Sequence, residues 1–262
     1  MTPPPPFFPG LAPATWHHLF EALAFLAAGQ IAWRLGARRV PSFGDRRRLV
    51  IVLAGAVLGS LVGAKLLHAL EFAPALAAAG APLSVWLGGK SIVGGLLGAI
   101  AGVEIAKRAA GIREATGDAF VLPLTAGMAI GRLGCFAAGL ADGTYGVPTT
   151  LPWGIDFGDG VARHPTQLYE ALFVLMAGIA LARWSSPRVL PGERFRLFVL
   201  AYLLFRFWVE FLKPPFGPAA DAGELVPALY GGMLTAIQLA ALLGLALYSR
   251  TALRLARSDR AA

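Results

Sequence analysis

Long apolar stretches alternate with short polar, glycine-rich or proline-rich segments along most of this chain. Seven of the apolar stretches are 17 to 25 residues long, which is the length that crosses about 30 Å of hydrocarbon as a helix. The pattern therefore predicts an all-α polytopic membrane protein with about seven transmembrane helices. We expect these helices near residues 16–35, 49–70, 91–107, 118–138, 165–184, 195–212 and 225–249.

The composition supports this prediction. Of the 262 residues, 56% are apolar and only 15% are charged, against about 25% charged residues in soluble proteins. The lone cysteine, Cys135, excludes an internal disulfide and a cysteine-rich metal site. The net charge of +8 alone would also suit a nucleic-acid-binding protein. The placement of the basic residues distinguishes a nucleic-acid-binding surface from a membrane topology signal.

Seventeen of the 23 lysines and arginines fall in alternate connections and in the C-terminal segment. Because basic residues are enriched on the cytoplasmic side, this alternation predicts the N-terminus outside and the C-terminus in the cytoplasm. Topology and anionic-lipid contact then explain the excess charge, and we expect no nucleic-acid partner. The six remaining basic residues are Lys65, Lys90, Arg132, Arg163, Arg206 and Lys213.

The rest of the chain is assigned around these spans. We expect an extended N-terminal tail over residues 1–15, a single transmembrane domain over 16–249 and a basic cytoplasmic tail over 250–262. Two connections, 71–90 and 139–164, are long, and we expect re-entrant or surface segments there on the periplasmic side.

Ionisable residues inside the predicted spans form a second informative set. Such groups are costly at membrane depth and by default face a bundle interior or an aqueous cavity. In the predicted orientation they all fall in the outer halves of their helices, which favours one polar cavity open to the outer leaflet. The set comprises His17, His18, Glu21, Lys65, His68, Arg132, His164, Glu170, Arg206 and Glu210.

Two arginines of this set have different sequence surroundings. Arg206 and Glu210 are four residues apart on one helix face, so they could form a purely structural pair. Arg132 has no acidic residue within four positions and needs a partner from another helix or from a ligand. A planar guanidinium suits a phosphate, and the alternative is a structural pair with Glu21 or Glu170.

Glycines are dense at residues 88–95 and 131–134. For Gly94, Gly95 and Gly98 we expect close helix packing. Gly88 and Gly89 precede a span and lie beside Lys90, so their amides could seat an anion.

Four motifs resemble those of the prolipoprotein diacylglyceryl transferases, which are seven-span bacterial inner-membrane enzymes. They occur in the family's order along the chain. They are Gly88-Gly89-Lys90-Ser91-Ile92-Val93-Gly94-Gly95, Gly131-Arg132-Leu133-Gly134-Cys135-Phe136-Ala137-Ala138-Gly139, Arg163-His164-Pro165-Thr166-Gln167-Leu168-Tyr169-Glu170 and Arg206-Phe207-Trp208-Val209-Glu210-Phe211.

The resemblance implies transfer of a diacylglyceryl group from phosphatidylglycerol to the lipobox cysteine of prolipoproteins, with release of glycerol phosphate. It places the protein in the bacterial inner membrane with its active site toward the periplasm or outer leaflet. It also implies that Arg132 and Arg206 hold phosphate and that Glu210 orients Arg206. Residues expected to bind substrate are Gly88, Gly89, Lys90, Gly131, Gly134, Cys135, Gln167, Tyr169 and Glu170.

The chain departs from the family motifs at several positions. The histidine of the first motif is Val93, which cannot accept a proton. In the second motif, Cys135 and Ala138 stand where the family has asparagines. Leu140 stands where the family has a glutamate, although Asp142 lies two residues further on. Another base would then be needed to deprotonate the substrate thiol. His164 is the first choice, ahead of His17, His18 and His68, and Cys135 is either a small apolar filler or a nucleophile.

Two other functions stay open from the sequence. One is a related membrane transferase that uses the same phosphate-binding cavity on a different acceptor. The other is a lipid-binding protein or transporter without chemistry, which the absence of a visible repeat disfavours. We expect no metal site, no cofactor and a monomer in contact with membrane lipids.

Overall fold

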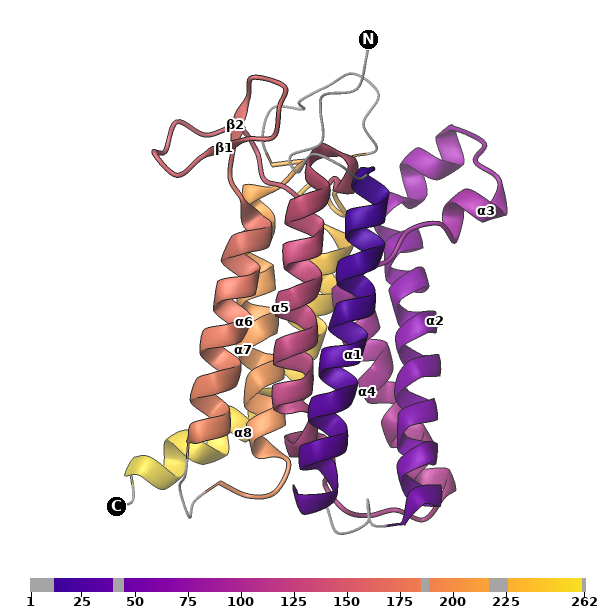
Figure 1. Cartoon of the computed structure of the whole chain (residues 1–262), viewed down its shortest axis with the longest axis vertical. Helices are drawn as coiled ribbons and strands as arrows, with labels where there is room; N and C mark the ends of the chain where they lie inside the picture. The colour runs from indigo at the N-terminus through magenta and orange to yellow at the C-terminus, as the bar shows by residue number, and fades with distance from the viewer. Residues whose placement is uncertain (1–11, 40–44, 185–188, 217–225, 261–262) are drawn as a thin grey trace.

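The computed structural model describes residues 12–39, 45–184, 189–216 and 226–260, and this part of the chain is a bundle of long helices (Figure 1). Successive long helices run in alternating directions, so their ends gather at an upper end and a lower end in Figure 1. The upper end is the one where α1 begins. The long helices are α1 (Pro13–Arg39), α2 (Arg46–Ala78), α4 (Ile92–Ala109), α5 (Val121–Ala138), α6 (Thr166–Arg183), α7 (Glu193–Val209) and α8 (Ala236–Arg260).

Shorter elements connect or extend these helices. The short α3 (Leu83–Trp86) lies between α2 and α4, and three 3-10 segments flank α5 and follow α7. One antiparallel pair of two-residue strands, β1 (Ile155–Asp156) and β2 (Ala162–Arg163), lies between α5 and α6. The 3-10 segments are η2 (Gly117–Phe120), η3 (Gly139–Asp142) and η4 (Glu210–Leu212). The prediction of an all-α fold is confirmed for the described residues.

Four segments are long and apolar enough to cross a membrane: α2, Gly117–Asp142 around α5, α6 and the first part of α8 through Arg254. The remaining long helices are more polar or shorter. α4 carries Glu104, Lys107 and Arg108 near its end, and α7 is 17 residues long. The described chain is therefore a helical membrane protein with at least these four candidate spans.

The outer surface of the bundle is strongly apolar. In the most apolar 18-residue stretch of α2, only 11% of the residues are buried. Phe25 and Leu26 of α1 and Leu247 of α8 are each more than two-thirds exposed. A soluble protein rarely exposes such continuous apolar surface, so lipid is its natural surrounding. The interior instead centres on Phe198, Tyr202 and their neighbours from α4, α5, α6 and α8.

A line of glycines holds α2 against α4. A Cβ added at Gly59 would lie 2.2 Å from the backbone oxygen of Gly98, and one added at Gly98 would meet Gly59 equally closely. Gly63 and Gly94, and Gly55 and Gly102, face each other in the same way. This spacing of four residues on both helices is the small-residue packing typical of membrane helices. The predicted packing role of Gly94 and Gly98 is confirmed.

The last helix begins later than the sequence pattern predicted. The expected span 225–249 is wrong at its start, because residues 226–235 contain turns and α8 begins at Ala236. Gly231 and Gly232 have positive φ angles of 62° and 72°, which a helix does not accommodate. Thr235 and Gln238 then form a capping box: the side-chain carbonyl of Gln238 accepts from the Thr235 amide, and the Thr235 hydroxyl accepts from the Gln238 backbone amide.

Both predicted tails are partly helical. α1 begins at Pro13, so the extended tail predicted over residues 1–15 is wrong for its last three residues, and residues 1–11 lie outside the described chain. The basic segment predicted as a tail from residue 250 continues α8 through Arg260. Arg254 belongs to the bundle, because its Nε donates to Glu193 of α7 at 2.7 Å.

The connection between α5 and α6 is built by local polar contacts. The Asp156 carboxylate accepts from the backbone amides of Gly158, Asp159 and Gly160 at 2.8–3.1 Å, which fixes the turn between the two strands. The Arg163 guanidinium lies 2.7 Å from the Asp159 carboxylate and holds the pKa of Asp159 below its usual range. This connection protrudes at the upper end (Figure 1), as does α3.

Candidate functional site

Two buried arginines share one glutamate near the upper end of the bundle. The Arg132 Nε lies 2.9 Å from one oxygen of Glu170, and the Arg206 Nη1 lies 3.0 Å from the other. The Arg206 Nη2 also lies 2.7 Å from Glu210. Arg132 comes from α5, Glu170 from α6, and Arg206 with Glu210 from α7 and η4, so three separate stretches of chain meet here. We call these four residues the arginine clamp.

The spacing on α7 explains half of the clamp. Tyr202, Arg206 and Glu210 follow one another at intervals of four residues, so they share one helix face. The Tyr202 hydroxyl donates to the oxygen of Glu170 that Arg132 approaches, at 2.7 Å. Tyr202 therefore positions Glu170 between the two arginines. Sequence reasoning missed this residue, because a tyrosine on an apolar helix gives no charge to notice.

Burial makes the clamp energetically demanding. The side chains of Arg206, Glu170 and Glu210 are at most 2% exposed, and that of Arg132 is 8% exposed. Charges removed from water this far need partners for nearly every donor and acceptor. Within the described chain, however, the Arg206 Nε has no acceptor, and the Arg132 Nε approaches Glu170 without the geometry of a hydrogen bond. The clamp is held by ion pairs between three stretches of chain, and the Arg206 Nε could still donate to an anion.

Gln167 adds a second unsatisfied group. It lies one turn before Glu170 on α6 and is 1% exposed, and neither its amide nitrogen nor its amide oxygen has a partner among the described residues. Buried amides in native proteins are nearly always hydrogen-bonded to protein, water or ligand. The arrangement favours a polar ligand or water beside the clamp.

His164 and Tyr169 form a separate cluster on the α6 side. The His164 Nδ1 lies 3.2 Å from the Tyr169 hydroxyl, which also accepts from the Trp153 Nε1 at 2.8 Å. The His164 backbone is anchored to Gly146 and Val147. No contact in the described chain joins this histidine to the clamp arginines, so the structure does not bring His164 together with Arg132 and Arg206.

The first glycine motif lies near the start of α1 rather than on the clamp. The Lys90 Nζ is 2.5 Å from Glu21 of α1, which leaves that lysine paired. A Cβ at Gly89 would lie about 2 Å from the His68 ring, while Gly88 is exposed. Among the described contacts, none links these three predicted substrate-binding residues to Arg132 or Arg206.

The glycines around Arg132 differ from each other in their surroundings. A Cβ at Gly134 would lie 2.5 Å from the Phe20 Cβ, so this glycine permits the close approach of α1 to α5. Nothing lies within 4 Å of the corresponding position at Gly131. Gly139 ends α5 with a φ of 62° and turns the chain into η3. That turn brings Asp142 back over the end of α5.

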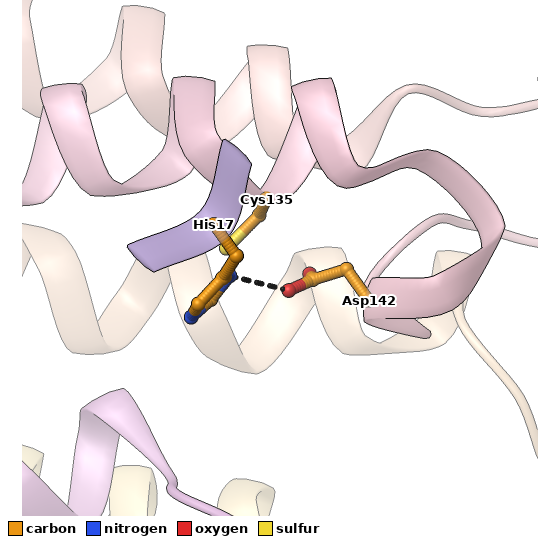
Figure 2. Close-up of side chains that lie close together, drawn as sticks. All are labelled: His17, Cys135 and Asp142. Carbon is orange, nitrogen blue, oxygen red and sulfur yellow. Dashed lines mark ion pairs between the residues drawn. The ribbon is translucent and has the colours of Figure 1, made fainter. Parts of the chain in front are cut away.

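His17, Cys135 and Asp142 meet at this turn (Figure 2). The His17 Nδ1 lies 2.9 Å from the Asp142 Oδ1, and donor atoms of all three residues lie within 4.8 Å of one another. The Arg132 Nη1 lies 3.8 Å from the Cys135 sulfur, so the cluster adjoins the clamp. The sequence showed each residue singly, but nothing in it brought His17 to Asp142.

The comparisons with known proteins agree with the motifs that form these sites. A family model described as prolipoprotein diacylglyceryl transferase matches residues 8–252. The chain belongs to the prolipoprotein diacylglyceryl transferase family.

Curated relatives of the chain carry the same description. Proteins named phosphatidylglycerol–prolipoprotein diacylglyceryl transferase from Nitratidesulfovibrio vulgaris (strain DP4) and Geobacter sulfurreducens are 36% and 37% identical to it. The first alignment covers 76% of this chain and 77% of the relative, and the second covers 76% and 78%. A protein of the same name from Bordetella parapertussis is 35% identical, with 76% of this chain and 78% of the relative covered.

Within this prolipoprotein diacylglyceryl transferase family member, three motifs gather into one region. The second, third and fourth motifs supply Arg132, Glu170, Arg206 and Glu210 to the clamp. The buried Lys213 and Glu71 are further ionisable side chains close to Glu210 and Arg206, and neither was among the predicted site residues. Glu71 was missed because α2 continues beyond residue 70, where a connection was expected.

Proposed function

We propose that this protein transfers the diacylglyceryl group of phosphatidylglycerol to the thiol of a lipobox cysteine in prolipoproteins, releasing glycerol phosphate. The observation that carries the proposal is the arginine clamp, in which two buried guanidinium groups converge on one carboxylate and the Arg206 Nε has no acceptor among the described residues. Membership of the prolipoprotein diacylglyceryl transferase family supports the substrate assignment.

The clamp suits the chemistry of this reaction. The substrate sulfur forms a bond to a glyceryl carbon while the bond from that carbon to a phosphate oxygen breaks, and the electron pair stays on the phosphate. Negative charge on the leaving group therefore grows as the reaction proceeds. Arg132 and Arg206 stabilise that charge with donors that are already in place before the reaction. Such preorganised stabilisation of developing charge is usually the largest contribution to catalysis. Glu170, Glu210 and Tyr202 orient the two guanidinium groups.

The same proposal includes seven membrane crossings, with the clamp on the periplasmic side of a bacterial inner membrane. Its support is the separation of charge along the bundle. The clamp and the cluster of His17, Cys135 and Asp142 belong to the upper end, whereas Arg46–Arg48, Arg108 and Arg183 come from helix ends at the lower end. Lower-end arginines on the cytoplasmic side satisfy the positive-inside rule. An outer-leaflet site meets both a lipid and a newly exported prolipoprotein.

Complementation tests the proposal in cells. The gene is expressed in bacteria depleted of their own diacylglyceryl transferase, and thioether lipidation of a reporter lipoprotein is measured by mass spectrometry. We expect lipidation with the unchanged chain and with Arg254→Ala, and loss of lipidation with Arg132→Ala and Arg206→Ala. No lipidated reporter despite normal membrane expression would sink the proposal, and lipid mass spectrometry of the same cells would reveal transfer to another acceptor.

A further inference from the structure

Three side chains with different ligand atoms converge beside the clamp. His17 comes from the first turns of α1, Cys135 from the end of α5 and Asp142 from η3, and their imidazole, thiol and carboxylate donors lie within 4.8 Å of one another (Figure 2). The convergence depends on the packing of α1 against α5 at Gly134 and on the turn at Gly139. Such convergence of three segments on one point is built into the fold rather than produced by neighbouring positions in the sequence.

We propose that His17, Cys135 and Asp142 bind a zinc ion and that the substrate thiol takes its fourth coordination position. Nitrogen, sulfur and carboxylate oxygen are the ligand types of Zn²⁺ in proteins. A site with three protein ligands and one open position is the arrangement found in catalytic zinc centres, whereas structural centres are closed by four.

The surroundings of the three residues fit such a site. The side chains of Asp142 and Cys135 are about nine-tenths buried, while that of His17 is 30% exposed and leaves one side of the cluster open. The second oxygen of Asp142 accepts a hydrogen bond from the Thr144 hydroxyl. Ligand carboxylates in metal sites are commonly oriented by an outer partner of this kind.

The proposed metal site supplies what the first motif lacks, and in this respect it rests on the proposed function. Val93 stands where the family has a histidine, so no base is available there to deprotonate the substrate thiol. A thiol bound to Zn²⁺ loses its proton to solvent and reacts as thiolate. Its sulfur then forms the bond to the glyceryl carbon, the carbon–oxygen bond to phosphate breaks, and the metal is not consumed.

The position relative to the clamp fits this sequence of events. The Arg132 Nη1 lies 3.8 Å from the Cys135 sulfur, while the Nε of the same guanidinium approaches Glu170. Arg132 therefore lies between the proposed thiolate site and the proposed phosphate site. Because one guanidinium group is small, a nucleophile and a leaving group bound on its two sides lie close to each other.

Metal content measured on the purified protein tests the site without any reference to activity. The full chain in nanodiscs is incubated with Zn²⁺, dialysed and analysed by inductively coupled plasma mass spectrometry, and Co²⁺ is substituted to observe thiolate-to-cobalt absorption. We expect about one zinc ion per chain and a thiolate charge-transfer band. Less than a tenth of an equivalent in a folded preparation, or no thiolate band with cobalt, would overturn the proposal.

Variants separate the site from general effects on folding. Cys135→Asn introduces the residue that the family motif has at this position, and we expect it to fold and to lose the stoichiometric metal. His17→Gln should behave in the same way, while Thr144→Val should weaken zinc binding by about tenfold. The matched control is His18→Gln, because His18 is the adjacent, largely exposed histidine. Equal metal content in Cys135→Asn and the unchanged chain would contradict the assignment.

Failure of this proposal and failure of the proposed function give different results. Stoichiometric zinc without lipid transfer would leave the metal site standing and remove the transferase assignment. Lipid transfer at an unchanged rate in a chelator-treated, zinc-free protein would leave the transferase assignment standing and overturn the role of the metal.

Discussion

Each end of the bundle contains an arginine–glutamate contact between helices, and the two contacts differ in what they leave unpaired. At the lower end, Arg254 of α8 meets Glu193 of α7, and the arginine side chain is 39% exposed. At the upper end, Arg132 and Arg206 converge on Glu170, and both are nearly excluded from solvent. The lower contact joins a partly exposed arginine to a buried glutamate.

The upper contact has more donors than its partners use. The Arg206 Nε has no acceptor in the described chain, although burial makes an unused donor expensive. A contact that served only to hold helices together would be better made with fewer buried charges. The same residue types therefore make a structural link at one end and, as we propose, an anion site at the other.

The largest expected effect comes from removing the shared charge. Glu170→Gln keeps the shape of the side chain but leaves two buried guanidinium groups without their common carboxylate, and we expect a loss of about 3–5 kcal/mol in unfolding free energy. Thermal unfolding in detergent measures this. Arg254→Ala is the lower-end control and should cost less, about 1–3 kcal/mol, because it leaves one buried carboxylate, that of Glu193, without its guanidinium partner. Equal losses of unfolding free energy in Glu170→Gln and Arg254→Ala would contradict the difference between the two contacts.

A smaller change tests whether the geometry of the guanidinium matters as well as its charge. Arg132→Lys retains the positive charge but loses the planar set of donors, so we expect transfer activity to fall by about 100-fold. Arg254→Lys should leave activity within about twofold, because it retains the positive charge beside Glu193 and lies at the opposite end of the bundle from the clamp. Initial rates with phosphatidylglycerol and a lipobox peptide give both values. An Arg132→Lys variant as active as the unchanged chain would refute bidentate phosphate binding.

The packing that supports the upper end can be tested independently of charge. Gly59→Ala places a Cβ 2.2 Å from the Gly98 carbonyl oxygen, so α2 and α4 must separate, at an expected cost of about 1–3 kcal/mol. Gly29→Ala in α1 is the matched control, since nothing lies within 4 Å of its Cβ position. Thermal midpoints of the two variants should differ by several degrees, and identical midpoints would contradict the close approach.

The smallest expected effect concerns the beginning of α8. Thr235→Ala removes the hydroxyl that caps the Gln238 amide and should destabilise the protein by about 1 kcal/mol. Ser249→Ala, within the same helix, removes an exposed hydroxyl that donates to the Ala246 carbonyl in the preceding turn, and it serves as control. Denaturation midpoints in matched detergent measure the difference, and a neutral Thr235→Ala would show that the capping box adds nothing.

Sequence patterns predicted the helical bundle because apolar periodicity and charged connections depend on local composition. They also predicted the residues of the clamp, since charges inside apolar spans stand out against their surroundings. The start of α8 was predicted wrongly because the apolar residues from Val226 onward conceal turns at Gly231 and Gly232. The capping box at Thr235 and Gln238 could have located that start.

The contact of Arg132 with Glu170 was one of the alternatives that the sequence left open, but other contacts across the bundle were beyond prediction. The pairing of His17 with Asp142 depends on the approach of α1 to the end of α5, which no local pattern specifies. In the sequence, Tyr202 is one of several aromatic residues on an apolar helix, and only the structure shows that its hydroxyl donates to Glu170. His164 stood out by its motif, yet its side chain contacts Tyr169, so its predicted role as the base stays a prediction.

Transfer by the reconstituted protein is the decisive measurement of the proposed activity. The purified protein in nanodiscs is given phosphatidylglycerol and a lipobox peptide, and both products are measured by mass spectrometry. We expect a peptide carrying diacylglyceryl on its cysteine together with an equal amount of glycerol phosphate, and neither product with Arg206→Ala. Consumption of phosphatidylglycerol without the cysteine-linked product, or unchanged product formation by Arg206→Ala, would contradict the proposed activity.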